Sequence, residues 1–198
     1  MTKDLEKLYT QEKEIDMGDY FDALKETMEW MGKHPRVRFI GQSCVWDGHA
    51  LFKSMPTVPM EKRLELPVME DFQMGMSIGL ALEGWIPVNI YPRSDFLIIA
   101  SNQLANHLAN IKITTEGKIS PRVITRVSVG GTTPMHPGIQ HCQDHTEAIK
   151  LITRGEVEVV ELRKKEDILP AYQHAVHRVD SKPTILVEYM DLYHTQKD

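Results

Sequence analysis

Residues 66–88, LPVMEDFQMGMSIGLALEGWIPV, constrain the fold more than any other part of the sequence. A short apolar approach leads through two acids, Glu70 and Asp71, into an apolar run that is too poor in polar residues for a surface helix. Gly84 stands where helices commonly end in a left-handed residue, and residues 86–90 have the β-branched character of a strand. The segment therefore predicts a strand, a buried helix and a second strand, with an acid at the start of the helix.

Four small residues fall within this expected helix, at Gly75, Ser77, Gly79 and Ala81. Each glycine weakens a helix by roughly 1 kcal/mol relative to alanine. Small side chains also let another backbone or a flat ligand approach closely. We therefore expect something to pack against this helix.

The rest of the chain alternates between helical and strand patterns. Apolar spacing and β-branched runs predict helices at 19–32, 94–108, 146–153 and 165–179, a short helix around 49–54, and strands at 37–40, 122–129, 157–162 and 184–189. Such alternation implies an α/β fold, a doubly wound and mainly parallel sheet with helices on both faces. Residues 1–18 are highly charged and are expected to form an N-terminal extension, and 19–198 a single domain.

Composition limits the partners. The 198 residues carry a formal net charge of −5 with both signs interspersed, which argues against nucleic acid and anionic membranes. No segment approaches the roughly eighteen apolar residues of a membrane span, and the N-terminus lacks an apolar signal region. We expect a soluble, cytoplasmic protein.

Its two cysteines, Cys44 and Cys142, lack a CxxC arrangement and are expected to be reduced, inert thiols.

The loop 132–145 contains residues that are chemically able to bind zinc, namely His136, His141, Cys142 and His145. The adjacency of two of them and the absence of a CxxC pair argue against a metal centre. A Cys142 nucleophile with a histidine base is a second alternative, although no third, orienting group can be placed. The sequence has no GxxxxGK[ST] or GxGxxG motif, so the chain has no obvious phosphate cradle of its own.

Three segments together resemble the pyrimidine-binding, transketolase-like domain of thiamine-diphosphate enzymes, most closely the β subunit of the E1 component of 2-oxo-acid dehydrogenases (pyruvate dehydrogenase E1 β type). They read LPVMEDFQMGMSIGLALEGWIPV, SDFLIIASNQLANHLANIK and GGTTPMHPGIQHCQDHTEAI. Two further pieces, ALKETMEWMGKHPRVRFIGQ and PTILVEYMDLY, resemble the opening and the closing of that domain. The resemblance covers residues 20–193, and its five pieces keep the family's order and spacing.

The resemblance implies roles for three residues. Glu70 matches the glutamate that hydrogen-bonds N1′ of the aminopyrimidine, Phe96 the ring that stacks on it, and His141 the active-site histidine near the substrate. Burial would favour a protonated Glu70, and an acid at N1′ favours the imino tautomer that takes the proton from thiazolium C2. An aromatic ring suits a flat heterocycle, and a histidine exchanges protons near neutral pH. Alternatively, Glu70 simply complements the helix dipole.

The chain also departs from the family pattern. Gln42 stands where the family usually has an acid, His49 replaces the second glycine of a pair, and Asn102 replaces an aspartate. The sequence stops at Asp198, where β subunits typically continue into a C-terminal domain, and it has no GDG motif for the diphosphate.

These departures shape what the resemblance implies about function. We expect the small subunit of a two-component enzyme that decarboxylates a 2-oxo acid or transfers its acyl or ketol fragment. Thiamine diphosphate would be shared with a separate α-type subunit that also holds Mg²⁺, in an α2β2 heterotetramer. The alternative is a non-catalytic regulatory or interaction paralogue with the same fold.

Overall fold

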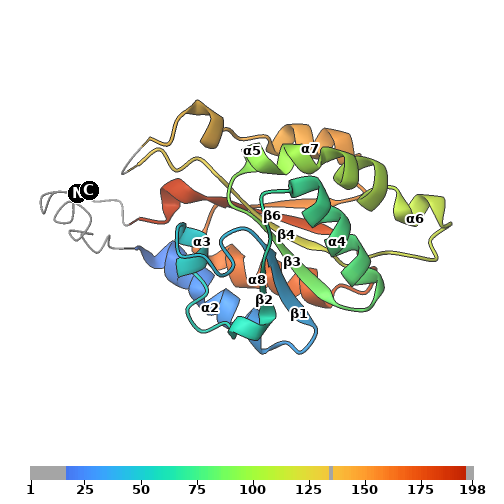
Figure 1. Ribbon diagram of the computed structural model, residues 1–198, viewed down its shortest axis with the longest axis horizontal. Helices are drawn as coiled ribbons and strands as arrows, with labels where there is room; N and C mark the ends of the chain where they lie inside the picture. The colour runs from blue at the N-terminus through green and yellow to red at the C-terminus, as the bar shows by residue number, and fades with distance from the viewer. Residues whose placement is uncertain (1–16, 134–135, 195–198) are drawn as a thin grey trace, which may run out of the picture.

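One sheet of six parallel strands forms the centre of the molecule (Figure 1). The computed structural model describes residues 17–133 and 136–194, so most of the expected N-terminal extension lies outside the described residues. The strands are β1 (Val37–Gly41), β2 (Arg63–Glu65), β3 (Ile86–Tyr91), β4 (Ile124–Val129), β5 (Glu158–Leu162) and β6 (Thr184–Tyr189), in the spatial order β2-β1-β3-β4-β6-β5. Every neighbouring pair is parallel, which confirms the predicted sheet.

Helices cover both faces of this sheet, as expected (Figure 1). One face packs against α2 (Asp19–Lys33), α3 (Ala50–Lys53) and α8 (Lys165–His177). The other packs against α4 (Glu70–Leu82), α5 (Ser94–Leu97), α6 (Ile111–Thr114) and α7 (Thr146–Thr153), with the 3₁₀ turn η2 (Ile98–Ala100) and the π-helical η3 (Gln103–Leu108). Three further 3₁₀ turns are η1 (Met60–Lys62), η4 (Ile139–His141) and η5 (Met190–Leu192). In the described ranges no helix is long and apolar enough to cross a membrane.

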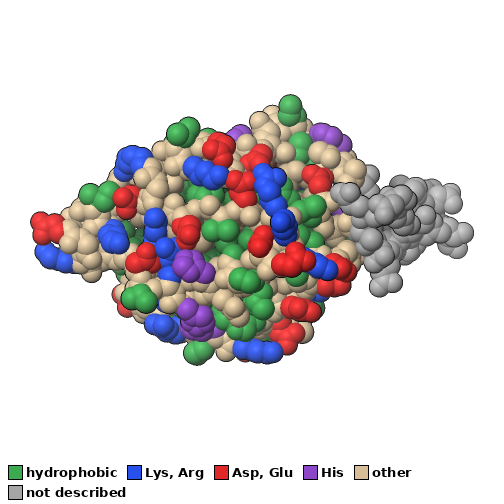
Figure 2. All heavy atoms as spheres, turned by 180° about the vertical axis from the view of Figure 1, so that it is seen from behind, with side chains coloured by type: hydrophobic (Ala, Val, Ile, Leu, Met, Phe, Trp, Pro, Cys, Tyr) green, Lys and Arg blue, Asp and Glu red, His purple; other side chains and the backbone are tan. Residues whose placement is uncertain are grey.

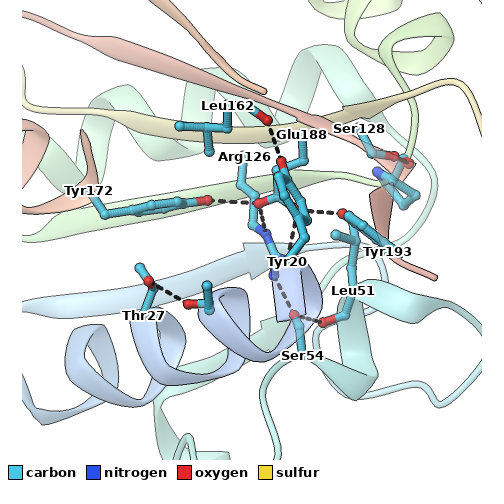
Figure 3. A network of polar contacts seen from close by, with 12 residues as sticks. Tyr20, Thr27, Leu51, Ser54, Arg126, Ser128, Leu162, Tyr172, Glu188 and Tyr193 are labelled. Carbon is cyan, nitrogen blue, oxygen red and sulfur yellow. Dashed lines mark hydrogen bonds and ion pairs between the residues drawn. The ribbon is translucent and has the colours of Figure 1, made fainter. Parts of the chain in front are cut away.

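A buried ion pair holds the core beneath α8 (Figure 3). Arg126 of β4 donates to both carboxylate oxygens of Glu188 of β6, at 2.5 and 2.9 Å, and both side chains are fully buried. Tyr172 and Tyr193 also donate to Glu188, and Arg126 donates to the hydroxyl of Ser54. Burial alone would lower the pKa of Arg126, but Glu188 raises it above its ordinary value. On the face of the molecule seen in Figure 2, by contrast, acidic and basic side chains are interspersed.

The sheet has a topological switch point between β1 and β3. From β1 the chain continues to β2 on one side, whereas β3 pairs with β1 on the other side. In open α/β sheets, ligands bind outside the carboxyl ends of the strands at such a point. This edge of the sheet is therefore where a functional site is expected.

Several local predictions were wrong. The strand expected before the helix, at 66–69, lies earlier in the chain. It is β2, which ends at Glu65. The single helix expected over 94–108 is a succession of α, 3₁₀ and π turns. The last helix, expected to extend to residue 179, ends at His177, and Val179 is 99% exposed. Periodicity locates helices well but does not register changes in the hydrogen-bonding pattern within them.

Candidate functional site

Glu70 is a buried acid whose carboxylate has no partner within the described residues. It is the first residue of α4 and is 4% exposed. Its backbone carbonyl accepts a hydrogen bond of 2.9 Å from the hydroxyl of Tyr91, which fixes the start of the helix against β3. Buried polar groups are normally hydrogen-bonded, and the neighbouring Asp71 likewise has a buried oxygen, Oδ1, without a partner among the described residues.

An open groove of about 620 Å³ lies beside Glu70. Its lining is mostly apolar and comprises Val68, Met69, Glu70, Asp71, Phe72, Gly75, Met76, Ile99 and Gln103. Val68 is 75% exposed, and Phe72 is also exposed. The predicted burial of this helix is thus correct for the side that faces the sheet and wrong for the outer side. Contiguous apolar surfaces of this kind usually mark an interaction site.

A chain of amides supports the start of α4 from beneath. Gln73 donates to the carbonyl of Ile90 at 2.8 Å and to the side chain of Asn89, and its own oxygen accepts from Gln42 at 2.9 Å. Gly41 makes room for this contact, because a Cβ atom there would lie 2.3 Å from the Ile90 oxygen. Sequence reasoning missed Gln73 and Asn89, although both are polar residues within apolar runs.

Phe96 and His141 meet edge to face, with ring centroids 5.6 Å apart. Phe96 belongs to α5, which follows β3, and His141 ends η4; both rings are half-buried. The two segments are joined by Ser94, whose hydroxyl donates to the Gln143 carbonyl at 2.8 Å. The structure therefore brings together two of the three predicted site residues. The groove beside Glu70 is lined by Ile99 and Gln103 of the next turns, and not by these two rings.

The four residues considered as zinc ligands do not converge. His136 and Cys142 approach to 4.0 Å between Nε2 and Sγ, but His141 faces Phe96, and His145 lies 3.7 Å from a carboxylate oxygen of Asp95. Among the described residues no group of three or more histidine, cysteine or acidic side chains is arranged to hold a metal. The other thiol, Cys44, is buried, and burial raises its pKa.

Comparison with known proteins supports the resemblance seen in the sequence. A β subunit of 3-methyl-2-oxobutanoate dehydrogenase from Mycobacterium tuberculosis is 29% identical over 139 residues, which are 70% of this chain and 38% of that protein. The pyruvate dehydrogenase E1 component subunit β of Cyanidium caldarium is 24% identical over 185 residues, which are 90% of this chain and 54% of that protein. The chain is a distant homologue of 2-oxo-acid dehydrogenase E1 β subunits. It spans about half the length of these relatives or less.

The fold agrees with this homology. A split-gene transketolase, solved as an inactive β4 tetramer, superimposes with a TM-score of 0.64 over 88% of this chain and 52% of that chain, at 14% identity. This likeness shows a transketolase-like fold for the E1 β homologue. No family model matches the sequence.

Two departures from the E1 β pattern have structural roles in this homologue. Gln42 is the amide partner of Gln73 described above. His49 is the N-cap of α3, where its Nδ1 accepts a hydrogen bond of 3.2 Å from the backbone N–H of Leu51. Burial, aided by the nearby cations Arg93 and Arg126, lowers the pKa of His49 to about 4. The imidazole is therefore neutral near pH 7, and its proton lies on Nε2.

Sequence reasoning also missed the anchor of the loop that follows β1. The carboxylate of Glu65 accepts hydrogen bonds from the consecutive backbone N–H groups of Ser43, Cys44 and Val45, at 2.8, 2.7 and 2.6 Å. Successive N–H groups that converge on one anion form a rigid nest. This nest holds the loop beside the start of α4.

Proposed function

We propose that this chain is the pyrimidine-binding subunit of a two-component, thiamine-diphosphate-dependent enzyme that decarboxylates a 2-oxo acid or transfers its acyl or ketol fragment. The observation that carries the proposal is Glu70, a buried carboxylate without a partner among the described residues, at the edge of an open groove. A ring nitrogen of the aminopyrimidine is the kind of group that would satisfy it. The homology to E1 β subunits supports the same assignment.

The residues present fit the cofactor's pyrimidine. Glu70 would hold N1′ by a shared proton, and its place at the N-terminus of α4 also suits a negative charge. The half-buried ring of Phe96 would provide the flat contact, and His141, which packs against it, would exchange a proton at the substrate's carbonyl oxygen. The cofactor, when bound, supplies a carbon nucleophile and an electron sink for the 2-oxo acid. The Glu65 nest and the Gln73 amides keep the supporting backbone rigid.

A separate α-type subunit would complete the enzyme. We propose that it carries the diphosphate-binding domain with Mg²⁺, that it covers the apolar groove, and that the assembly is an α2β2 heterotetramer in the cytoplasm. A Cβ atom built at Gly79 of α4 would meet nothing within 4 Å. This open space would let a partner subunit pack closely against the outer side of the helix. The inactive β4 state of the structural neighbour is in keeping with a β-type chain that needs a partner.

The test is to purify the tagged chain with its partner and compare Glu70→Gln and Glu70→Ala with wild type. We expect turnover to fall by about 10²- to 10⁴-fold, because proton sharing at the ring nitrogen is lost. Glu83→Gln is the matched control, since Glu83 is an exposed acid at the other end of α4. Circular dichroism should show an unchanged fold. Full activity in Glu70→Ala would exclude the proposed role.

A further inference from the structure

Arg93 is a charged residue that the function proposed above leaves without a role. It follows β3 at the carboxyl edge of the sheet and precedes α5. Its Nη1 donates a hydrogen bond of 2.7 Å to the carbonyl oxygen of Gly130, the residue after β4. A Cβ atom at Gly131 would lie 2.8 Å from Nη1, and Gly131 has a φ of +77°. The guanidinium therefore occupies a space that glycine leaves open.

Most of the hydrogen-bonding capacity of Arg93 is unused. A guanidinium has five N–H donors in a planar fork, and one of them has a partner within the described residues. No ion pair in the same residues includes Arg93. The acids that act on it electrostatically accept hydrogen bonds from other groups: Asp95 accepts from Gln143 at 3.0 Å through one of its two carboxylate oxygens. Asp191 accepts from the backbone N–H groups of Gly131 and Thr132, both at 3.1 Å.

This cation is partly removed from water without a close counter-ion. Burial lowers the pKa of Arg93 from its ordinary value, although the side chain remains charged near neutral pH. The neighbouring His49 is neutral there, and Arg126 is neutralised by Glu188. A partly desolvated, unpaired cation is costly unless an anion joins it.

Arg93 is connected, through the residue that follows it, to the loop that contains His141. Ser94, the following residue, donates to the Gln143 carbonyl and accepts from the backbone N–H of His145 at 3.3 Å. The loop that contains His141 is thereby attached to the turn that contains Arg93.

We propose that Arg93 binds the anionic group of the substrate, a carboxylate or a phosphate, and thereby sets which substrates the enzyme accepts. The inference rests on the function proposed above and extends it to the substrate. Arg93 is well suited to this role because its fork matches the paired oxygens of either anion. A purely structural role would need only the single bond to Gly130.

The kinetic test uses the chain with its co-purified partner and three variants: Arg93→Gln, Arg93→Lys and the control Arg36→Gln. Arg36 is exposed and precedes β1, so this control makes the same charge change at the opposite edge of the sheet. Loss of a charged hydrogen bond predicts a KM for the anionic substrate about 10- to 100-fold higher in Arg93→Gln, with a smaller change in kcat. Arg93→Lys should lie in between, because it keeps the charge without the fork. An unchanged KM in Arg93→Gln would overturn the proposal.

A second measurement does not depend on turnover. Phenylglyoxal modifies arginine, and peptide mass spectrometry reports its rate at Arg93 and at Arg36 in the same sample. We expect either pyruvate or inorganic phosphate to slow modification about tenfold at Arg93 and not at Arg36, as for an anion bound at [L] ≈ 10 Kd. Protection by pyruvate identifies a carboxylate and protection by phosphate a phosphorylated substrate. Absence of protection by both would refute an anion site at Arg93, whereas protection in a complex without turnover would refute only the proposed reaction.

Discussion

Two buried glutamates of this chain have opposite surroundings. Glu188 lies in the core between the sheet and α8, where Arg126, Tyr172 and Tyr193 all donate to its carboxylate (Figure 3). Glu70 lies at the carboxyl edge of the sheet and is almost as buried, yet no described residue donates to its carboxylate. The fold thus satisfies a carboxylate completely where the role is structural. The contrast is what the role proposed for Glu70 predicts.

The largest expected effect breaks the satisfied site. Glu188→Gln should lower the free energy of unfolding by about 3–5 kcal/mol, because Arg126 would remain buried without its counter-ion. Urea denaturation of the variant and the wild type measures the difference. The double variant Arg126→Met/Glu188→Leu is the control and should regain much of the loss, since it removes both charges. If the Glu188→Gln protein were as stable as wild type, the structural role of Glu188 would be contradicted.

A smaller, pH-dependent effect on stability is expected from His49, which lies near the cations Arg93 and Arg126. Its pKa is lowered to about 4 in the folded state, below the value of roughly 6.5 for a free histidine. The unfolded chain therefore binds more protons between these values, so stability falls as pH decreases from about 6.5 to 4. Between pH 7 and pH 5 the loss should be on the order of 2 kcal/mol.

The variant His49→Asn isolates this contribution. Asparagine is a good N-cap, so α3 keeps its cap while the titrating imidazole is lost. Urea unfolding at pH 7 and pH 5 should then show a weaker pH dependence than in wild type. An equal pH dependence of stability in the two proteins would contradict the contribution assigned to His49.

The smallest stability effect is expected at Glu70. Glu70→Gln should stay within about 0.5 kcal/mol of wild type, because no hydrogen bond from a described residue to the carboxylate is lost. Thermal unfolding of the isolated chain tests this. Together with the loss of turnover expected from the same variant, it would separate function from stability at this position. A loss comparable with that of Glu188→Gln would mean that Glu70 has a structural partner.

Much of the fold could be predicted because strong local patterns coincide with the elements. The helix Thr146–Thr153 and the strand Thr184–Tyr189 have the predicted bounds, and α3 lies within the predicted 49–54. By contrast, β2 has three residues, of which Leu64 is exposed, so its strand character comes from pairing with β1 and not from its own sequence. Hydrophobic periodicity does not detect such a strand.

The candidate site was predictable in its residue types and not in its geometry. Glu70, Phe96 and His141 were identified through the family resemblance, and the structure brings Phe96 and His141 together. Their roles stay predictions. Arg93 is not part of any sequence motif. Only the structure shows that its guanidinium donates to the carbonyl of Gly130 and has few other partners. Pairing between distant segments leaves no local signal in a single sequence.

The sequence by itself determined the alternation of strands and helices, because side-chain polarity and backbone preference act over a few residues. It also determined the presence of an acid, an aromatic ring and a histidine in the family's order. Only the tertiary structure decided that Glu188 is saturated while Glu70 is not, and that Arg93 is held beside β4 with most donors unused. The physical reason is that hydrogen bonding and desolvation of a charge depend on groups brought near by the sheet order, which lie tens of residues away along the chain.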